Sequence, residues 1–530
     1  MEVIISLSGL DVQLMLSSSK INRAMALLNK KPILGYILDE LYSYSDFIGK
    51  IYIVGNNLEE VENFFKFDYK DEFFKTKIVC LKNEDSSGFA TDFYSAIEYM
   101  ADNQNVTEAE VLLWRGNELL RKTKVFTDYS IGSFQCYDKD RKINVYKMVK
   151  FPHIVNNLLY LKENNSLDME TFLNRYQEWD TMKKLDYDFE YVKLDNDIDF
   201  YNAECEFINN DSHKNHYVSV DLRDQTIEFL NKYSNINFSR KCYDICRNIQ
   251  WDLWSEYNFL EHANSEQMAY LPYPINRSID MRGEYCDRVK LRWIPDASLK
   301  YTMLYQTINQ ELWKNIFDKV CYILSSKFHK KEDSPAFRID KPIIEDWIRK
   351  LLHNAKCAIP PVLGKRKEIY FWMELYDKFE ADLRKYINYD TLFYNGIENR
   401  LVFGDLSLEH IKCNLSNGDI HFVSPLYRTR KIVSPMEDYS SMLTDTYCLY
   451  SLFECGKYID YGKNGVDMPD HIGDSAENIT SAISNNISDI ELMKEYSLFL
   501  SLMKFFDIPD DNKMAFFNFL NFRVREILNG

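Results

Sequence analysis

The feature that most constrains this chain is an alternation of short apolar runs with amphipathic helical patterns over its first 115 residues. Pro32 opens the clearest helical pattern, in which apolar residues recur at helical spacing as far as Leu41. Such alternation predicts a largely parallel sheet with helices on both faces, and ligands bind these sheets at the carboxyl ends of the strands. The expected strands cover residues 2–7, 50–54, 77–81 and 111–114.

The pattern changes at the polar residues 209–215, which are typical of a linker between domains. Beyond them, residues 217–220 and 226–230 predict a β-hairpin. From about residue 305 the chain is mostly helical, apart from an extended stretch over residues 401–425 and a polar stretch over residues 465–486 that predicts a loop. We therefore expect two domains, residues 1–212 and 213–530, in a chain of 530 residues.

Charge and composition narrow the classes of partner. The chain carries 64 basic and 81 acidic residues, a formal net charge of −17, and no long run of Lys or Arg. Because nucleic-acid backbones repel an acidic protein that lacks a basic face, we expect small molecules rather than nucleic acid as partners. A hydrophobic fraction of 46% excludes wholesale disorder.

Cysteine usage and apolar runs bear on the cellular compartment. The 11 cysteines are scattered, and the close pair Cys242 and Cys246 lacks the second pair and the histidine spacing of a zinc site. The most apolar stretch, residues 498–506, is shorter than the roughly 18 residues of a membrane span and predicts a buried helix. The first residues lack the basic start of a secretory signal. We expect a cytoplasmic protein with reduced thiols and no membrane insertion.

The order of residues in the first domain forms a longer pattern. Ser8 and Gly9 follow the first expected strand, and Arg23 precedes the helix-opening proline. Asn117 follows the fourth strand, and Asp195 begins an acidic segment at the end of the domain. This order resembles that of the sugar-nucleotide and choline-phosphate nucleotidyltransferases of GT-A type. In that family a Gly-rich loop, a lysine, a Pro-opened helix, a Gly-Asp pair and an acidic closing segment follow one another.

The resemblance implies a doubly wound sheet that binds an NTP, with CTP as one candidate, and a phosphorylated small alcohol or sugar. Nucleotidyl transfer builds up negative charge, which a fixed cation and Mg²⁺ neutralise. The implied roles are nucleotide binding for Ser8 and Gly9, catalysis for Arg23, and Mg²⁺ coordination for Asn117 and Asp195. Arg23 stands where the family has lysine and Asn117 where it has aspartate, so Asp195 is the retained metal carboxylate.

A second local pattern lies at residues 402–411, where Phe-Gly-Asp ends at Asp405 and His-Ile begins at His410. This spacing resembles the catalytic loop of aminoglycoside and choline kinases, in which His-Gly-Asp is followed after four residues by Asn-Ile. The continuation is similar as well. It contains a hairpin turn at residues 417–419, an apolar strand ending at residue 425 and a helix that includes Asp438.

The second resemblance implies a bilobal, kinase-like α+β domain rich in helices over residues 213–530. In that family the equivalent of Asp405 positions the acceptor hydroxyl, and the equivalents of Lys232 and Glu256 form the pair that holds ATP phosphates. His410 stands where the family has a metal-binding asparagine, and Ser424 where it has a metal-binding aspartate. Imidazole and hydroxyl groups are poor partners for Mg²⁺, so both metal ligands are replaced.

Each candidate also has an interpretation without function. Gly9 suits an ordinary turn, Arg23 an exposed surface and Asp195 a solvated acidic loop. Asp405 suits a turn that caps its own backbone. The other candidates of the second domain, His410 included, suit solvated or packed positions.

Three hypotheses follow for the function. Fusions of these two kinds of domain occur in bacterial surface-polysaccharide and capsule pathways, where one half phosphorylates a small alcohol and the other activates the product with a nucleotide. The chain is then a transferase active in at least one half, above all the first, or a nucleotide-binding pseudoenzyme, or a structural or interaction protein that kept both folds. A transferase should release pyrophosphate, and a pseudoenzyme should bind nucleotides without turnover. A structural or interaction protein should not respond to nucleotides.

Overall fold

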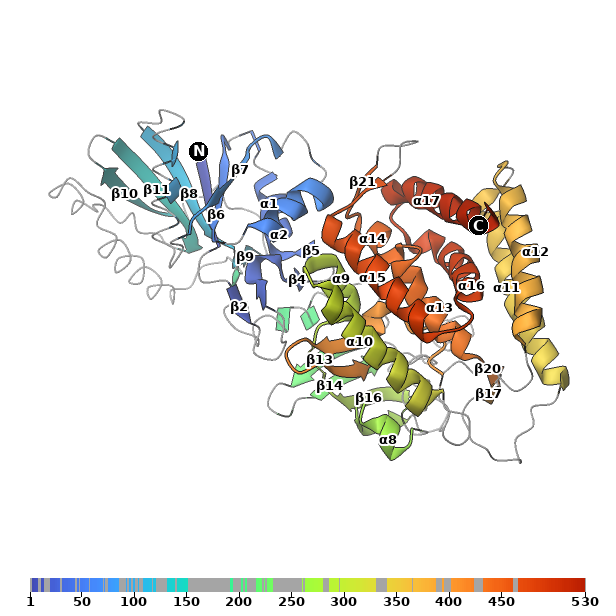
Figure 1. The fold of residues 1–530 in the computed structure, drawn as a ribbon. Helices are drawn as coiled ribbons and strands as arrows, with labels where there is room; N and C mark the ends of the chain where they lie inside the picture. The colour runs from blue at the N-terminus through green and yellow to red at the C-terminus, as the bar shows by residue number, and fades with distance from the viewer. Residues whose placement is uncertain are drawn as a thin grey trace, which may run out of the picture. The chain divides into compact units, whose positions relative to one another are not determined.

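The computed structural model divides the chain into two compact units, Met1–Phe207 and Ile208–Gly530 (Figure 1). This boundary lies just before the polar residues 209–215, and the one expected after residue 212 lies within them. The structure describes residues 2–7, 11–13, 20–28, 31–42, 45–46, 48–56, 58–69, 71, 75–84, 92, 95–96, 99–100, 103, 108–116, 118–120, 131–138, 141–150, 191–193, 202–203, 205–206, 216–221, 224, 226–231, 260, 263–279, 286–294, 296–329, 341–364, 366–387, 393–394, 402–423, 432–460 and 466–529.

The first unit contains a six-stranded sheet of order β10-β11-β8-β1-β6-β7. All neighbouring strands pair in parallel except β10 and β11, which form an antiparallel hairpin at one edge. The strands expected from the apolar runs and the largely parallel sheet are confirmed. The six strands are β1 (Glu2–Ser6), β6 (Ile51–Gly55), β7 (Ile78–Lys82), β8 (Glu108–Arg115), β10 (Ile131–Asp138) and β11 (Arg141–Lys150).

Helix α1 (Ile33–Tyr42) begins directly after Pro32, as its sequence predicts. The apolar face expected from the helical spacing is buried from Ile33 to Leu41. Burying each large apolar side chain stabilises the folded chain by about 1.5–3 kcal/mol. The remaining elements of this unit are β2 (Asp11–Gln13), β3 (Lys20–Asn22), η1 (Arg23–Met25), β4 (Leu27–Leu28), β5 (Lys31–Pro32), α2 (Glu59–Asn63), the π-helical turn η2 (Phe64–Asp68), β9 (Glu118–Leu120) and β12 (Tyr191–Lys193).

The second unit begins with a four-stranded antiparallel sheet of order β13-β14-β16-β15. Its strands β13 (His216–Asp221) and β14 (Thr226–Asn231) form the hairpin that the sequence predicts. β15 (Pro274–Ile279) and β16 (Cys286–Arg292) complete it. After β16 the chain turns to helices, so the expected mixed α/β class with a helix-rich second half is confirmed.

Local capping sets several helix starts in the second unit. The Ser298 side chain accepts a hydrogen bond from the Tyr301 backbone at the start of α9, and Asn309 caps α10 in the same way. The elements are α8 (Ser265–Met268), α9 (Leu299–Tyr305), α10 (Gln310–Ile323), η5 (Leu324–Phe328), α11 (Lys341–Leu363), α12 (Ile369–Tyr386), β17 (Phe393–Tyr394), η6 (Leu408–His410), β18 (Ile411–Asn414), β19 (Asp419–Phe422), β20 (Ile432–Val433), α13 (Pro435–Thr446), α14 (Tyr450–Cys455), β21 (Ile459–Asp460), β22 (Val466–Asp467), α15 (Asp470–Asn486), α16 (Ile490–Met503), η8 (Phe505–Asp507) and α17 (Asp510–Asn529).

The extended stretch predicted within the helical part is a β-hairpin of β18 and β19. Its turn contains Gly418 at φ +71°, in the left-handed region that favours glycine. The hairpin turn that the sequence predicts at residues 417–419 is therefore confirmed.

The prediction of a loop over residues 465–486 is wrong. Most of this segment is α15, and Ile472, Ala476, Ile479 and Ile483 recur along one buried face of it. Polar residues fill the exposed side of the helix, so the average composition concealed a narrow apolar stripe with helical period.

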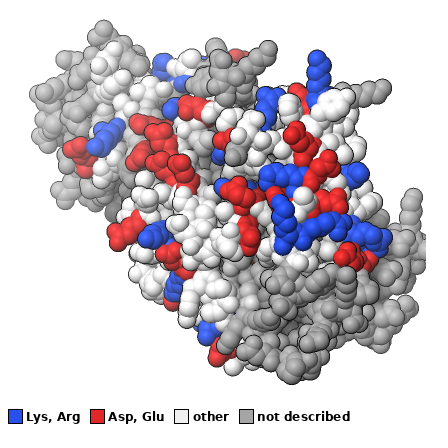
Figure 2. Space-filling view, turned by 45° about the vertical axis from the view of Figure 1, so that its right-hand side comes forward, with Lys and Arg blue, Asp and Glu red and all other residues white. Residues whose placement is uncertain are grey.

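The apolar stretch at residues 498–506 ends α16 and enters η8. Leu498, Phe499 and Leu502 are buried, which confirms a buried helix over the first part of this stretch, whereas Met503 and Phe506 are exposed. Of the helices in the described part of the chain, none has the length and apolar character that crossing a bilayer requires. On the face shown in Figure 2, acidic side chains lie among the basic ones.

Candidate functional site

The loop that carries Asp405 lies between buried aromatic side chains and α13. Phe403, which stands where the resembled family has histidine, packs its ring 5.1 Å from Phe328 and 5.2 Å from Phe422 between centroids. The next residue, Gly404, has φ +79°, a backbone conformation that side chains disfavour. The buried Phe403 ring and this sharp turn direct Asp405 out of the core, so that its side chain is 18% exposed.

A buried carboxylate on α13 holds the start of this loop. Asp438 accepts hydrogen bonds from the Phe403 backbone at 3.0 Å and from the Gly404 backbone at 2.6 Å. The imidazole of His329 lies 2.9 Å from the same carboxylate through Nε2. Asp438 is fully buried, so removing any of these donors leaves an incompletely compensated carboxylate in the core.

A second carboxylate of α13 holds the end of the loop. Asp445 lies two helical turns after Asp438, about 10 Å along the axis, and accepts a hydrogen bond from the Leu408 backbone at 2.8 Å. Its other oxygen accepts from the Ser451 hydroxyl. Burial raises the pKa of the Asp445 carboxyl, which nearby Lys300 and these hydrogen bonds oppose. One helix thus fixes both ends of the segment that presents Asp405.

The carboxylate of Asp405 forms an ion pair with Lys504, at the end of α16. The Lys504 Nζ lies 3.1 Å from Asp405 Oδ1, and the lysine side chain is 28% exposed. An acceptor hydroxyl at this position would share the Asp405 carboxylate with the Lys504 ammonium.

His410 closes the loop on itself. Its Nδ1 donates a hydrogen bond to the Asp405 backbone carbonyl at 2.9 Å, and the His410 carbonyl accepts from the Val423 backbone. Nδ1 is engaged and Nε2 is the nitrogen left for a ligand, but imidazole is a poor partner for Mg²⁺. By donor type, His410 is therefore a poor match for the Mg²⁺ role that the resemblance implied for its position.

A buried lysine ties the same loop to its neighbours. Lys300 of α9 contacts Glu454 of α14 at 2.6 Å and Glu409 of the loop at 3.0 Å, with its own side chain 11% exposed. Burial opposes the lysine charge, but Glu409, Glu454 and Asp445 together raise the pKa of Lys300. The loop is held by charge on its outer side as well as by backbone hydrogen bonds to α13.

Polar side chains also gather at the carboxyl edge of the parallel sheet in the first unit. Ser6, the last residue of β1, donates to the buried carboxylate of Asp92 at 2.7 Å, and Asn83, just after β7, donates to its other oxygen at 3.1 Å. The Gly116 backbone, just after β8, donates to the Ser6 carbonyl. Two strand ends therefore meet at one buried carboxylate and the end of β8 is tied to one of them, on the edge where ligands bind such sheets.

Most first-unit candidates follow these strand ends. Ser8 and Gly9 come after β1 and Asn117 comes after β8, and all three lie outside the described residues, as does Asp195. The backbone of Arg23 begins η1.

Several second-unit candidates also fall outside the described residues. They are Lys232, which follows β14 in the chain, Glu256, Ser424 and the pair Cys242 and Cys246. Of the second-unit candidates for catalysis, nucleotide binding and metal binding, the structure brings Asp405 and His410 together in one loop.

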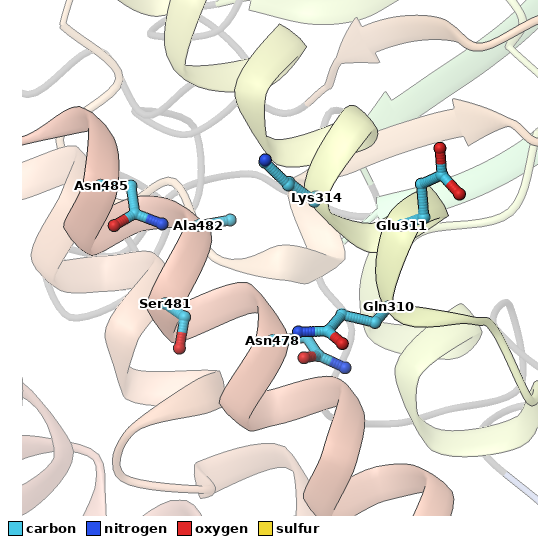
Figure 3. Close-up of a pocket in the computed structure, with 7 residues that line it drawn as sticks. All are labelled: Gln310, Glu311, Lys314, Asn478, Ser481, Ala482 and Asn485. Atoms are coloured by element: carbon cyan, nitrogen blue, oxygen red, sulfur yellow. The ribbon is translucent and has the colours of Figure 1, made fainter.

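The described residues contain no group of three or more His, Cys, Asp or Glu side chains placed to hold a metal ion. A polar groove of about 270 Å³ lies between α10 and α15 (Figure 3). Gln310, Glu311 and Lys314 line it from α10, and Asn478, Ser481, Ala482 and Asn485 line it from α15. None of the sequence-predicted candidates is among them, and its side chains carry no arrangement typical of catalysis.

Sequence reasoning missed Lys504, Asp445 and Asp92. The seven-residue spacing between Asp438 and Asp445 on an expected helix was a usable signal, because it places both carboxylates on one face. Lys504 interrupts an apolar stretch, but nothing near it in the sequence indicates a partner 99 residues away.

Comparisons with known proteins identify no family for this chain, because no protein-family model and no curated protein matches it. Three solved structures are similar over 60% of the chain. The GDP complex of aminoglycoside 2'-phosphotransferase-IIIa has 14% identity, a TM-score of 0.34 and 92% of its own chain covered. ADP-bound aminoglycoside phosphotransferase APH(2'')-Ib has 11% identity, a TM-score of 0.32 and 90% of its own chain covered. Choline kinase from Cryptosporidium parvum Iowa II has 12% identity, a TM-score of 0.29 and 87% of its own chain covered. At such low TM-scores the likeness establishes neither a fold family nor an activity.

Proposed function

We propose that the first unit is a nucleotidyltransferase, which joins the nucleotidyl group of an NTP to a phosphorylated small alcohol or sugar and releases pyrophosphate. The observation that carries the proposal is the meeting of Ser6, Asn83 and the buried Asp92 at the carboxyl edge of a parallel sheet. β1 and β8 are neighbours in parallel register, with Ser6 opposite Arg115, so the chain leaves both strands at this same edge.

Three of the residues proposed for chemistry, Ser8, Gly9 and Asn117, follow those strand ends. Ser8 and Gly9 would bind the nucleotide, and Arg23 would neutralise phosphate charge. Asn117 and Asp195 offer the oxygen donors that Mg²⁺ prefers, so by donor type they fit the ion. When bound, Mg²⁺ would supply the remaining charge neutralisation. The sequence resemblance of the second half to aminoglycoside and choline kinases favours bacterial surface-polysaccharide biosynthesis as the setting.

The test is pyrophosphate release over a panel of NTPs, with CTP included, and of phosphorylated alcohols and sugars. We expect Mg²⁺-dependent release with one combination. Asp195→Asn should lower that rate by roughly 10²–10³, the range for loss of one strong electrostatic contact. The matched control is Asp197→Asn in the same acidic segment, which should keep most of the rate. Absence of turnover across the panel, with folded protein, would remove the proposal.

A second candidate function is that the second unit is a nucleotide-binding pseudoenzyme. The ion pair of Asp405 with Lys504 favours this function. The unit's acceptor-positioning carboxylate is paired with this lysine, and His410 is a poor match for Mg²⁺. Calorimetry should then show nucleotide binding that changes little with Mg²⁺, and no phosphate should pass from ATP to a small alcohol. ATP-dependent phosphorylation that Asp405→Asn abolishes would contradict this assignment.

A further inference from the structure

One exposed face of α11 carries a thiol beside an imidazole. His353 and Cys357 are four residues apart, so they lie on the same side of the helix, and both side chains are exposed. The Cys357 Sγ lies 3.5 Å from His353 Nε2 and 3.9 Å from Nδ1. This is hydrogen-bond distance for sulfur, and a nucleophile within reach of a base is typical of an activated thiol.

Cys357 differs in its surroundings from the other cysteines that the structure describes. Among them it alone is exposed, whereas Cys321, Cys413 and Cys448 are buried. Burial raises the pKa of the Cys321 and Cys413 thiols to about 12 and that of Cys448 to about 11. Those thiols stay protonated and out of reach of reagents, and thiolates are the reactive form.

Two lysines lie near the pair in the sequence of α11. Lys350 lies one turn before His353 and is paired with Asp346, and Lys356 adjoins Cys357 with its ammonium 5.4 Å from the Tyr376 ring centroid. Each ammonium thus has a contact of its own, and the polar group at hydrogen-bond distance from Cys357 Sγ is the His353 imidazole.

We propose that Cys357 is a thiol-modification site, activated by His353, that reacts with low-molecular-weight disulfides. His353 Nε2 accepts the Sγ proton, and the thiolate attacks one sulfur of the disulfide. The bond from Sγ to that sulfur forms as the original S–S bond breaks. The departing thiolate takes the proton from the imidazolium and leaves as a thiol. Cys357 is thereby oxidised to a mixed disulfide, and half of the small disulfide is reduced.

The experiment treats the full folded chain with glutathione disulfide and follows each cysteine-containing peptide by mass spectrometry over time. Cys357 should be modified well before Cys321, Cys413 and Cys448. His353→Gln keeps a polar side chain of similar reach without the base, and it should slow modification of Cys357 roughly ten-fold. The control Asn354→Ala, one residue along the same helix, should keep the parental rate.

Two outcomes would overturn the proposal. If Cys357 reacts at the same rate in the His353→Gln variant as in the parent, the thiol is merely exposed and the imidazole does not activate it. If Cys357 gains no glutathione while the protein stays folded by circular dichroism, the site does not take up disulfides at all. Alkylation by iodoacetamide gives an independent second rate for the same comparison.

Discussion

At the scale of single residues, neighbours decide what a side chain can do. Asp405 stands at a position that its sequence context associates with phosphoryl transfer, yet its carboxylate is paired with Lys504. In the same loop His410 Nδ1 donates to a backbone carbonyl, which leaves Nε2 of an imidazole that suits Mg²⁺ poorly. These two contacts show that a residue can occupy a motif position without having the surroundings that the chemistry of the motif requires.

The Asp405–Lys504 pair should be measurable as a coupling energy. In a double-mutant cycle of Asp405→Asn and Lys504→Met, we expect a favourable coupling of about 0.5–1 kcal/mol in the free energy of denaturant unfolding, because both side chains are partly buried and still reach solvent. The exposed pair Lys513–Asp510 provides the control cycle and should couple more weakly. Equal couplings would show that the contact at Asp405 is an ordinary surface pair.

Glu495 of α16 should make stability depend on pH. Burial raises the pKa of this carboxyl from 4.5 to about 7, although Lys378 opposes the shift. Between these values the unfolded carboxyl releases its proton while the folded one keeps it, so rising pH favours unfolding and stability is lost up to about pH 7. Glu495→Gln cannot ionise, so it should gain roughly 2–3 kcal/mol relative to the parent from about pH 5 to about pH 8.

The measurement is the free energy of denaturant unfolding of the parent and Glu495→Gln chains at about pH 5 and at about pH 8. A difference between the two chains that stays constant with pH would mean that Glu495 ionises normally in the folded protein.

At the scale of elements, α13 organises the candidate site of the second unit. Asp438 and Asp445 hold the two ends of one loop through backbone hydrogen bonds, and an aromatic cluster holds the loop from the side of Phe403. A loop fixed at both ends presents Asp405 in one orientation, whatever ligand it meets.

Asp438→Asn should be strongly destabilising. The amide offers one acceptor oxygen where the carboxylate accepted from Phe403, Gly404 and His329, and its NH₂ group faces a donor in the core. We expect a loss of roughly 2–4 kcal/mol in unfolding free energy. Asp474→Asn on the exposed side of α15 is the matched control and should change stability little. Equal effects of the two substitutions would show that the buried carboxylate does not hold the loop.

The elements of the fold follow closely from local sequence patterns. α1 could be predicted because its apolar residues repeat at helical spacing after a proline, and the hairpin turn at Gly418 because Asn-Gly favours the left-handed region. α15 could not be recognised by average polarity, since a helix with one narrow buried stripe is polar overall.

At the scale of the whole molecule, each compact unit has a sheet and a core of its own. Residues 1–207 and 208–530, expressed separately, should each unfold cooperatively, because a compact unit with its own core can fold alone. The thermal transitions of the two pieces should match transitions of the full chain by calorimetry. A piece that shows no cooperative transition would mean that it needs the rest of the chain to fold.

The sequence by itself determined the strand–helix alternation of the first unit, the helix-rich character of the second and the loop that contains Asp405, because each depends on the periodicity or turn chemistry of neighbouring residues. Only the tertiary structure decided that Lys504 pairs with Asp405, that Asp438 and Asp445 hold its loop, and that Asp92 joins the ends of β1 and β7. Ion pairs and buried hydrogen bonds between distant residues arise from packing, and packing leaves no signal at a fixed spacing along the chain.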